Sequence, residues 1–194
     1  MAKKADRRVQ RTQQLLEAAL LSLIKQKPFD AISVQEIIDR ANVGRATFYA
    51  HYDNKVDLLA SGFEGLEQTL KQRQREAHSR VGNTDERLFA FSYALLAHAD
   101  EHRDAFPAMV GKRGGAVIQH ALRNLLVQLV REDVKAMSEG RKDLVPAEAT
   151  VHFIAGGLFG LLMWWLNGKM RLSVDDANRI FRQLSIPALR AAVR

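Results

Sequence analysis

Five side chains in one short stretch can donate hydrogen bonds to anionic or polar partners: Arg45, Thr47, Tyr49, His51 and Lys55. An Arg can form two hydrogen bonds with guanine O6 and N7, and a Thr can offer its hydroxyl or methyl group to a base edge. Tyr, His and Lys can donate to phosphate oxygens, which fixes a protein on a duplex without selecting its sequence. Side chains of these types can therefore contact DNA.

A second group with possible chemistry is the pair His98 and His102, which are four residues apart. On a helix they would lie one turn apart, where two imidazoles could share a metal ion. Asp100 and Glu101 lie between them, but a Glu directly after the first His, as in zinc peptidases, is absent. The chain also has no cysteine, which excludes disulfides, thiolate zinc sites and a cysteine nucleophile. We therefore expect no catalytic residues, no metal site and no cofactor.

The elements that would position these groups are helices throughout. Apolar residues recur with the 3.6-residue period of a helix along most of the 194 residues, and only four prolines interrupt them. We expect an all-α fold of about nine helices, counting one short helix in the irregular link at 103–115. The others should run roughly over 7–25, 34–41, 44–51, 54–78, 85–102, 115–137, 146–167 and 174–192, with Asp53 capping the fourth.

Two of the short helices form a recognisable pair. Ser33 and Glu36 have the spacing of a capping box, which marks the beginning of the first. Ala41 is small enough for the two helices to approach closely. Asn42 is one of the few non-glycine residues that tolerate the left-handed conformation expected in the turn between them. This arrangement predicts a helix-turn-helix unit whose second helix enters the major groove.

The stretch Thr47-Phe48-Tyr49-Ala50-His51-Tyr52, followed by Lys55, resembles the end of the recognition helix in the TetR family of transcriptional regulators. The resemblance covers about the first 60 residues, and beyond them only helix number, length and order match. It implies a three-helix DNA-binding domain at 1–55 and a helical ligand-binding and dimerisation domain at 56–194. Asn42 replaces the commoner Gly and Tyr52 the commoner Phe. We expect Phe48 and Tyr52 to belong to the core.

The resemblance also implies roles for individual residues. Arg45 and Thr47 stand at positions that face base edges, and Gly44 stands at the beginning of the recognition helix. Ser33, Tyr49 and His51 stand at positions that contact phosphates, and Lys55 resembles the family's phosphate-binding lysine. The predicted DNA-binding set is Ser33, Gly44, Arg45, Thr47, Tyr49, His51 and Lys55.

Charge agrees with an anionic partner. The chain has a formal net charge of +7 and a pI near 9.9. Charge alone does not distinguish DNA from an anionic membrane as the partner. Nor does it distinguish a DNA-binding N-terminal arm from a solvated charged tail. The longest apolar run, 153–166, has 14 residues, fewer than the roughly 20 needed to cross a bilayer. No apolar segment follows immediately after the basic N-terminus, so we expect no signal peptide. We therefore expect a cytoplasmic protein without a membrane partner.

A symmetric operator requires a two-fold dimer, and the helix at 146–167 is the best candidate for the interface because it is apolar on almost every face. Its glycines each cost roughly 1 kcal/mol relative to Ala, which is understandable if another backbone passes closely. The interface candidates are Gly156, Gly160, Trp164 and Phe181. The alternative is a core helix of a single chain.

The helix at 85–102 also carries a possible ligand site. Phe91, Leu95, His98 and His102 share one face, which begins apolar and ends in two titratable groups. An apolar cavity with a few polar groups suits a small molecule. His120 and His152 are further candidates for its walls. Alternatively, His98 is a hydrogen-bonded core residue and His102 an exposed helix end.

The predicted function is a ligand-responsive transcriptional regulator, most simply a repressor. It would bind a palindromic double-stranded operator as a homodimer and leave it when an unidentified small-molecule effector binds. Two alternatives stay open: a constitutive DNA-binding repressor without an effector, and a helical metal-dependent enzyme.

Overall fold

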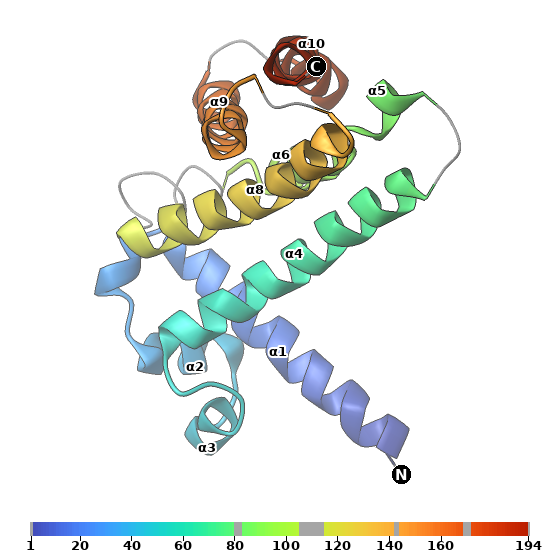
Figure 1. Cartoon of the computed structure of the whole chain (residues 1–194). Coiled ribbons are helices and arrows are strands. Elements are labelled where there is room, and N and C mark those ends of the chain that lie inside the picture. The colour runs from blue at the N-terminus through green and yellow to red at the C-terminus, as the bar shows by residue number, and fades with distance from the viewer. Residues whose placement is uncertain (1, 80–82, 105–114, 142–143, 169–171, 194) are drawn as a thin grey trace. The chain divides into compact units, whose positions relative to one another are not determined.

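The structure is a computed structural model that describes residues 2–79, 83–104, 115–141, 144–168 and 172–193. All regular elements of these residues are helices (Figure 1), as the sequence predicts. The chain divides into two compact units, the first comprising 1–65 and 104–119 and the second 66–103 and 120–194. The expected short helix in the link falls largely within 105–114, outside the described residues.

The first unit contains α1 (Ala2–Ile24), the 3₁₀ turn η1 (Phe29–Ala31), α2 (Val34–Ala41), α3 (Arg45–Tyr49) and the beginning of α4 (Lys55–His78). α1 packs against α2, and α2 against α3. Apolar side chains from each of these helices form one small core. Its fully or almost fully buried members include Leu16, Leu20, Ile24, Phe29, Ile37, Phe48 and Leu58.

The boundaries of α2 follow the sequence signals. Ser33 accepts from the backbone N–H of Glu36, and the Glu36 carboxylate accepts from that of Ser33, so the predicted capping box is present. At the other end, Asn42 has φ 52° and ψ 48°, the left-handed conformation expected of the turn. The helix-turn-helix arrangement is therefore encoded by local side-chain and backbone preferences.

The predicted cap of α4 is wrong by one residue. The Oδ1 atom of Asn54, not Asp53, accepts from the backbone N–H groups of Val56 and Asp57, at 2.8 and 3.2 Å. Both Asn and Asp are good capping residues. Asn54 caps the helix because it directly precedes the first helical residue, Lys55.

The first compact unit extends beyond the predicted boundary at residue 55, to Gly65 within α4. A physical reason is the hydroxyl of Ser61, which bonds to the Tyr52 hydroxyl at 3.1 Å and to the Glu17 carboxylate at 3.3 Å. These contacts tie the second turn of α4 to α1. Tyr52 is buried as predicted, and its hydroxyl has partners that a Phe would lack.

The second unit contains the rest of α4, α5 (Thr84–Arg87), α6 (Phe91–Glu101), most of α8 (Gly115–Ser138), α9 (Ala147–Asn167) and α10 (Val174–Ala192). α10 packs against both α6 and α9 (Figure 1). Pro146 is the N-cap of α9, and Ser173 caps α10 by accepting from the N–H of Asp176, as its spacing predicts.

One helix was expected where the structure has two, α5 and α6. Phe89 breaks it with φ 56°, an unusual value for an aromatic residue. Its ring is fully buried and contacts the ring of Phe181 with centroids 5.4 Å apart. The guanidinium of Arg182 donates to the carbonyls of Asp85 and Leu88, which the break leaves free. Packing against α10 therefore overrides the helical pattern of the sequence.

A buried carboxylate links α4 to α8. Asp133 on α8 is fully buried and accepts from Gln74 at 2.7 Å and from Nε2 of His78 at 2.8 Å. This hydrogen bond raises the pKa of His78, and burial raises the pKa of Asp133. The cluster supplies partners for groups that would be costly to bury alone.

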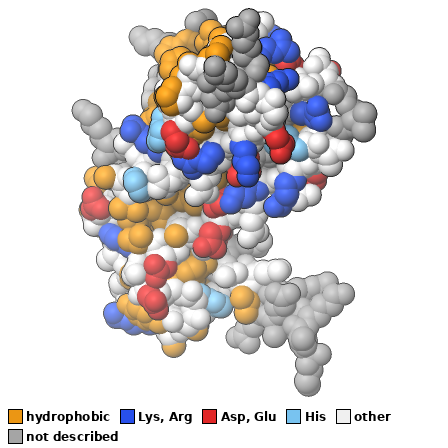
Figure 2. All heavy atoms as spheres, viewed as in Figure 1, with side chains coloured by type: hydrophobic (Ala, Val, Ile, Leu, Met, Phe, Trp, Pro, Cys, Tyr) orange, Lys and Arg blue, Asp and Glu red, His pale blue; other side chains and the backbone are white. Residues whose placement is uncertain are grey.

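Of the part of the chain that the structure describes, α9 alone is long and apolar enough to cross a membrane, with 21 residues and a mean hydropathy of 1.6. It is longer than the 14-residue apolar run because the helix continues through less apolar residues at both ends. A single such helix is weak evidence, because the core helix of a soluble protein has the same properties. In Figure 2 hydrophobic side chains gather over α9.

Candidate nucleic-acid interface

The recognition helix α3 is fixed by one apolar anchor. Phe48 is fully buried, whereas Arg45 and Tyr49 on the same short helix are exposed. Gly44 precedes the helix in an extended conformation, and its carbonyl accepts from the N–H groups of Thr47 and Phe48 at 2.9 and 3.2 Å. Burial of one side chain thus determines which side chains of α3 face outward.

The outer face of α3 presents a cation beside an aromatic ring. Arg45 and Tyr49 are four residues apart and therefore share a face, with the guanidinium carbon 5.8 Å from the centre of the tyrosine ring. The edge of the Tyr49 ring packs on Phe48, and 47% of the residue is exposed. Thr47 and His51 are half-buried next to this face. Arg45 and Tyr49 can therefore donate hydrogen bonds outward from a helix that the buried Phe48 anchors.

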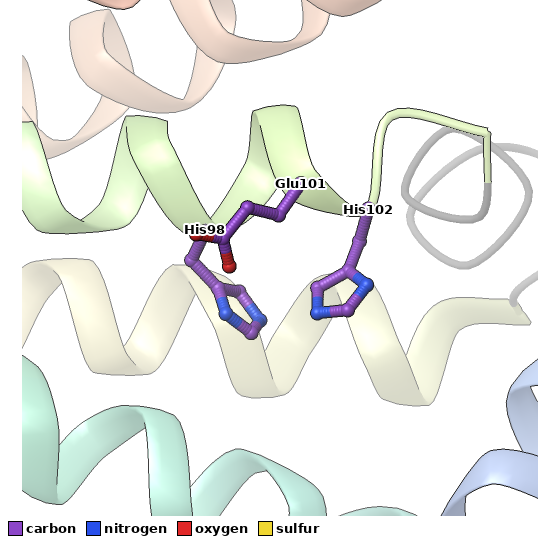
Figure 3. Close-up of side chains that lie close together, drawn as sticks. All are labelled: His98, Glu101 and His102. Carbon is purple, nitrogen blue, oxygen red and sulfur yellow. The ribbon is translucent and has the colours of Figure 1, made fainter.

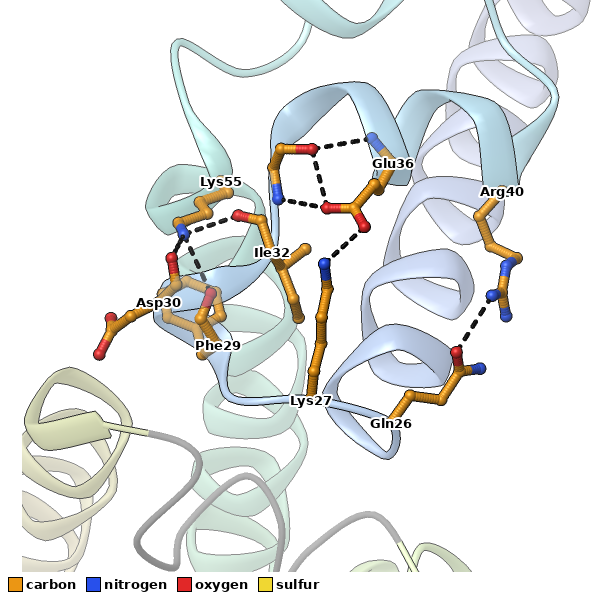
Figure 4. A network of polar contacts seen from close by, with 9 residues as sticks. Gln26, Lys27, Phe29, Asp30, Ile32, Glu36, Arg40 and Lys55 are labelled. Atoms are coloured by element: carbon orange, nitrogen blue, oxygen red, sulfur yellow. Dashed lines mark hydrogen bonds and ion pairs between the residues drawn. The ribbon is translucent and has the colours of Figure 1, made fainter.

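Ser33 is exposed, but its hydroxyl is engaged with the protein. It donates to the Glu36 carboxylate at 2.8 Å in addition to capping α2 (Figure 4). Lys27 approaches the same carboxylate at 2.5 Å, and the hydrogen bonds from Lys27 and Ser33 lower the pKa of Glu36 to about 2. Ser33 therefore positions the beginning of α2.

Lys55 differs most from its predicted role. Its Nζ atom donates to the backbone carbonyls of Phe29, Asp30 and Ile32 at 2.9, 3.0 and 2.7 Å (Figure 4). An ammonium group has three donors, and each has a carbonyl partner. The side chain closes the η1 turn against the beginning of α4, and its ammonium group points at the protein backbone instead of outward.

Sequence reasoning missed two basic residues that position this unit, Lys27 and Arg40. Lys27 forms the ion pair with Glu36, nine residues away in sequence. Arg40 on α2 donates to the Ser22 hydroxyl on α1 at 2.7 Å. Both contacts connect different elements, so no local spacing in the sequence predicts them.

The predicted effector residues of α6 separate into two kinds. Phe91 and Leu95 are fully buried and belong to the core. His98 and His102 are half-buried, and their ring centroids are 4.7 Å apart. Burial and the neighbouring His102 lower the pKa of His98. The predicted shared face of α6 is present, but its apolar half is filled by the protein's own packing.

The other two histidines of the predicted effector set are exposed. His120 on α8 contacts the Asn124 side chain at 2.9 Å. His152 on α9 lies 3.8 Å from Glu148, and it borders a surface pocket of about 300 Å³. The structure therefore places both at the surface and not in a buried ligand cavity.

The four dimer candidates comprise three exposed residues and one buried residue. Gly156 and Gly160 are exposed on α9, and a Cβ atom at either would meet no other atom within 4 Å. Trp164 is 50% exposed, whereas Phe181 is only 2% exposed because it packs in the core against Phe89. Phe181 is thus unavailable as a surface contact. Leu184 is 70% exposed on α10.

Comparison with known proteins assigns both parts of the chain. Residues 15–61 match the family described as bacterial regulatory proteins, tetR family. Residues 86–186 match a family described as a transcriptional regulator C-terminal region. Among curated proteins, the HTH-type transcriptional regulator YxbF of Bacillus subtilis (strain 168) is 43% identical over 58 residues. That match spans 29% of this chain and only 15% of the relative's length.

Solved structures match over almost the whole chain. A TetR transcriptional regulator from Streptococcus agalactiae 2603V is 25% identical, with a TM-score of 0.68, and 95% of this chain and 99% of the other are covered. RolR, solved in complex with resorcinol, is 18% identical with a TM-score of 0.58 over 96% and 95% of the two chains, which shows the fold alone. With a helix-turn-helix head and both segments matched, this chain belongs to the TetR family of bacterial transcriptional regulators, which are DNA-binding proteins and not enzymes.

Proposed function

We propose that the protein is a cytoplasmic repressor that binds a palindromic operator as a homodimer and leaves it when a small-molecule effector binds. The observation that carries the proposal is the exposed face of α3, where Arg45 and Tyr49 project from a helix anchored by Phe48. The proposed contacts are Arg45 and Thr47 with base edges. Tyr49, which is 47% exposed, donates to a phosphate.

Two further phosphate contacts and one revised role complete the surface. We propose that His51 contacts a phosphate. Ser33, which is exposed at the beginning of α2, lies next to the DNA backbone in this proposal. Gly44 lets the duplex approach the beginning of α3. Lys55 acts indirectly, by holding η1 and α4 in place through three carbonyls.

The exposed face of α9 supports a homodimer. Phe153 is 71% and Trp164 50% exposed, and Gly156 and Gly160 lie between them at helical spacing. Leu184 on α10 adds a third exposed apolar side chain. Large apolar side chains next to glycines with open space in front of them suit close packing against a second copy.

Effector control is supported by the connection between the two units. α4 belongs to both, because residues as far as Gly65 lie in the first unit and those from Leu66 lie in the second. A ligand that prefers the position of α4 unsuited to DNA lowers DNA affinity, by at most the ratio of its affinities for the two states. RolR, which has the same fold, was solved with resorcinol, so an aromatic or similarly small effector is a reasonable first class to screen.

Footprinting on the DNA upstream of the protein's own gene tests the DNA-binding part. We expect protection of an inverted repeat and an affinity that falls steeply with salt. The effector part is tested by adding compounds that raise the thermal stability of the protein and measuring operator affinity. Binding of random DNA with equal affinity contradicts the operator proposal. If compounds bind but none changes operator affinity, the constitutive alternative replaces effector control.

A further inference from the structure

Three potential metal ligands lie together at the C-terminal end of α6. One ligand atom from each of His98, Glu101 and His102 falls within 4.8 Å of the others. Both imidazoles project from the same side of the helix, and the Glu101 carboxylate extends toward His98 (Figure 3). All three residues belong to the second unit, so the geometry does not depend on how the two units are placed.

The backbone holds these groups in a fixed arrangement. His98 lies in the last turn of α6, and the N–H of His102 still donates to the His98 carbonyl at 3.2 Å. The two rings are therefore one turn apart, with centroids separated by 4.7 Å at an interplanar angle of 67°. A ligand pair on one rigid helical turn needs only side-chain rotation to converge on an ion.

Among the described residues, the rings of His98 and His102 contact each other, and no hydrogen bond from another described side chain occupies their ring nitrogens. The neighbouring carboxylate, Asp100, is engaged by Arg103 at 2.9 Å, which leaves Glu101 as the available oxygen donor. The unprotonated nitrogen of a neutral imidazole is a hydrogen-bond acceptor and a metal ligand, so a ring nitrogen without a hydrogen-bond donor nearby can bind a cation.

We propose that His98, Glu101 and His102 form a binding site for a divalent transition-metal ion of the zinc class. Two imidazole nitrogens favour zinc, nickel or copper, whereas magnesium and calcium prefer six or more oxygen ligands. Zinc bonds of about 2.0–2.2 Å place tetrahedral ligands about 3.3 Å apart, so the observed spacing must contract on binding. Rotation of the exposed Glu101 side chain and of the two rings supplies that contraction.

The proposed site departs from the expectation of no metal site. That expectation considered only a Glu directly after the first His, but here Glu101 directly precedes the second. The order His-x-x-Glu-His also occurs in zinc enzymes, where the two His of the motif bind the ion. Three protein ligands leave a coordination position open. We infer metal binding and no catalysis. The proposed site does not depend on the proposed effector control, because its metal affinity is measured without DNA.

Titration of the full-length chain, without a histidine tag, tests the site with Zn²⁺ by calorimetry and with Co²⁺ by visible absorption. We expect one ion per chain and a Co²⁺ spectrum of nitrogen–oxygen ligation. His98→Ala and His102→Ala should each weaken Zn²⁺ binding by about 100-fold or more, since losing even a second-shell partner costs 10–100-fold. Glu101→Gln should weaken it by about tenfold or more.

His120→Ala and His152→Ala are matched controls, because both remove an exposed histidine from another helix. They should leave the stoichiometry and affinity unchanged. Circular dichroism of each variant checks that α6 is still folded, and His102→Ala, at the cap of the helix, is the variant least able to disturb it. The site is refuted by wild-type protein that binds neither ion at millimolar concentration, or by His98 and His102 variants that bind as tightly as the controls.

Discussion

The guanidinium of Arg45 is the group on α3 best suited to select a base, because it is exposed and rests beside a tyrosine ring. Arg45→Ala should remove about 1–3 kcal/mol of discrimination between the operator and random DNA. Tyr49→Phe, which loses only a hydroxyl, should weaken both complexes similarly. Fluorescence anisotropy with the two duplexes measures the difference. An equal loss on both duplexes for Arg45→Ala would assign this side chain to a phosphate instead.

Lys55 illustrates a residue whose type suggests one role and whose contacts indicate another. Lys55→Met removes three hydrogen bonds from a charged donor to backbone carbonyls. We expect the free energy of unfolding of the first unit to fall by about 2 kcal/mol or more. The dependence of log Kd on log salt should keep its slope in DNA binding, because no phosphate contact is lost.

Lys71→Met is the control for that experiment, since the ion pair of Lys71 within the described residues is an i,i+4 pair with Glu67 on α4. Such exposed pairs contribute about 0.5 kcal/mol or less. Urea denaturation compares the two variants. A Lys55 variant with unchanged stability and a salt slope smaller by about 1 would restore the direct phosphate contact.

At the scale of elements, the sequence predicts what short-range contacts determine. The boundaries of α2 and α10 follow from Ser and a carboxylate three residues apart, and the turn after α2 follows from Asn42. The anchoring of α3 by Phe48 was also predictable, because Phe48 and Tyr52 stand four residues apart in the motif and were expected in the core. These features require only a few neighbouring residues to be known.

Other features depend on residues far apart in sequence. The break at Phe89 requires Phe181 and Arg182, more than 90 positions away, and the carbonyl partners of Lys55 lie more than 20 positions before it. Phe181 was predicted to be an interface residue because the sequence does not show that its ring packs against Phe89. The sequence therefore indicates which residues are apolar or charged, whereas tertiary packing decides which side of a helix is already covered.

The contact between α4 and α8 makes a prediction about pH. Because the Asp133 carboxylate raises the pKa of His78, the folded chain holds this proton more tightly than the unfolded chain does. The stabilisation is fully present below the unfolded pKa of about 6.5 and is lost as the pH rises through the folded pKa. The raised pKa of Asp133 acts in the same direction.

We therefore expect the difference in unfolding free energy between wild type and His78→Gln to shrink as the pH rises from about 6 to 8.5. Urea denaturation over this pH range measures it. Asp133→Ala should lower stability at every pH, by about 1–3 kcal/mol, because Gln74 loses its buried acceptor. A difference between wild type and His78→Gln that stays constant with pH would mean that the Asp133 contact does not affect this titration.

At the scale of the whole molecule, α9 has one buried face and one exposed apolar face. α9 buries residues such as Ile154, Leu158 and Leu162 against the rest of its unit, while Phe153 and Trp164 remain exposed on the other side. A helix apolar on every face cannot be satisfied by one neighbour. The same helix is thus the core of one chain and, in the proposed dimer, the centre of the interface.

Gly160→Arg separates these two functions of α9. A Cβ atom added at this position meets no neighbouring atom within 4 Å in the single chain, and Arg favours a helix by up to about 1 kcal/mol relative to Gly, so the folded monomer should be at least as stable as before. A close crossing with a second copy cannot accommodate that side chain, and we expect the dimer dissociation constant to rise by 100-fold or more in analytical ultracentrifugation. Gly62→Arg, at an exposed glycine of α4 that also has open space in front of it, should leave the dimer intact. Affinity for a full palindrome should fall in the Gly160 variant, whereas affinity for a single half-site should be retained. A Gly160 variant that remains dimeric would place the interface on another face of the molecule.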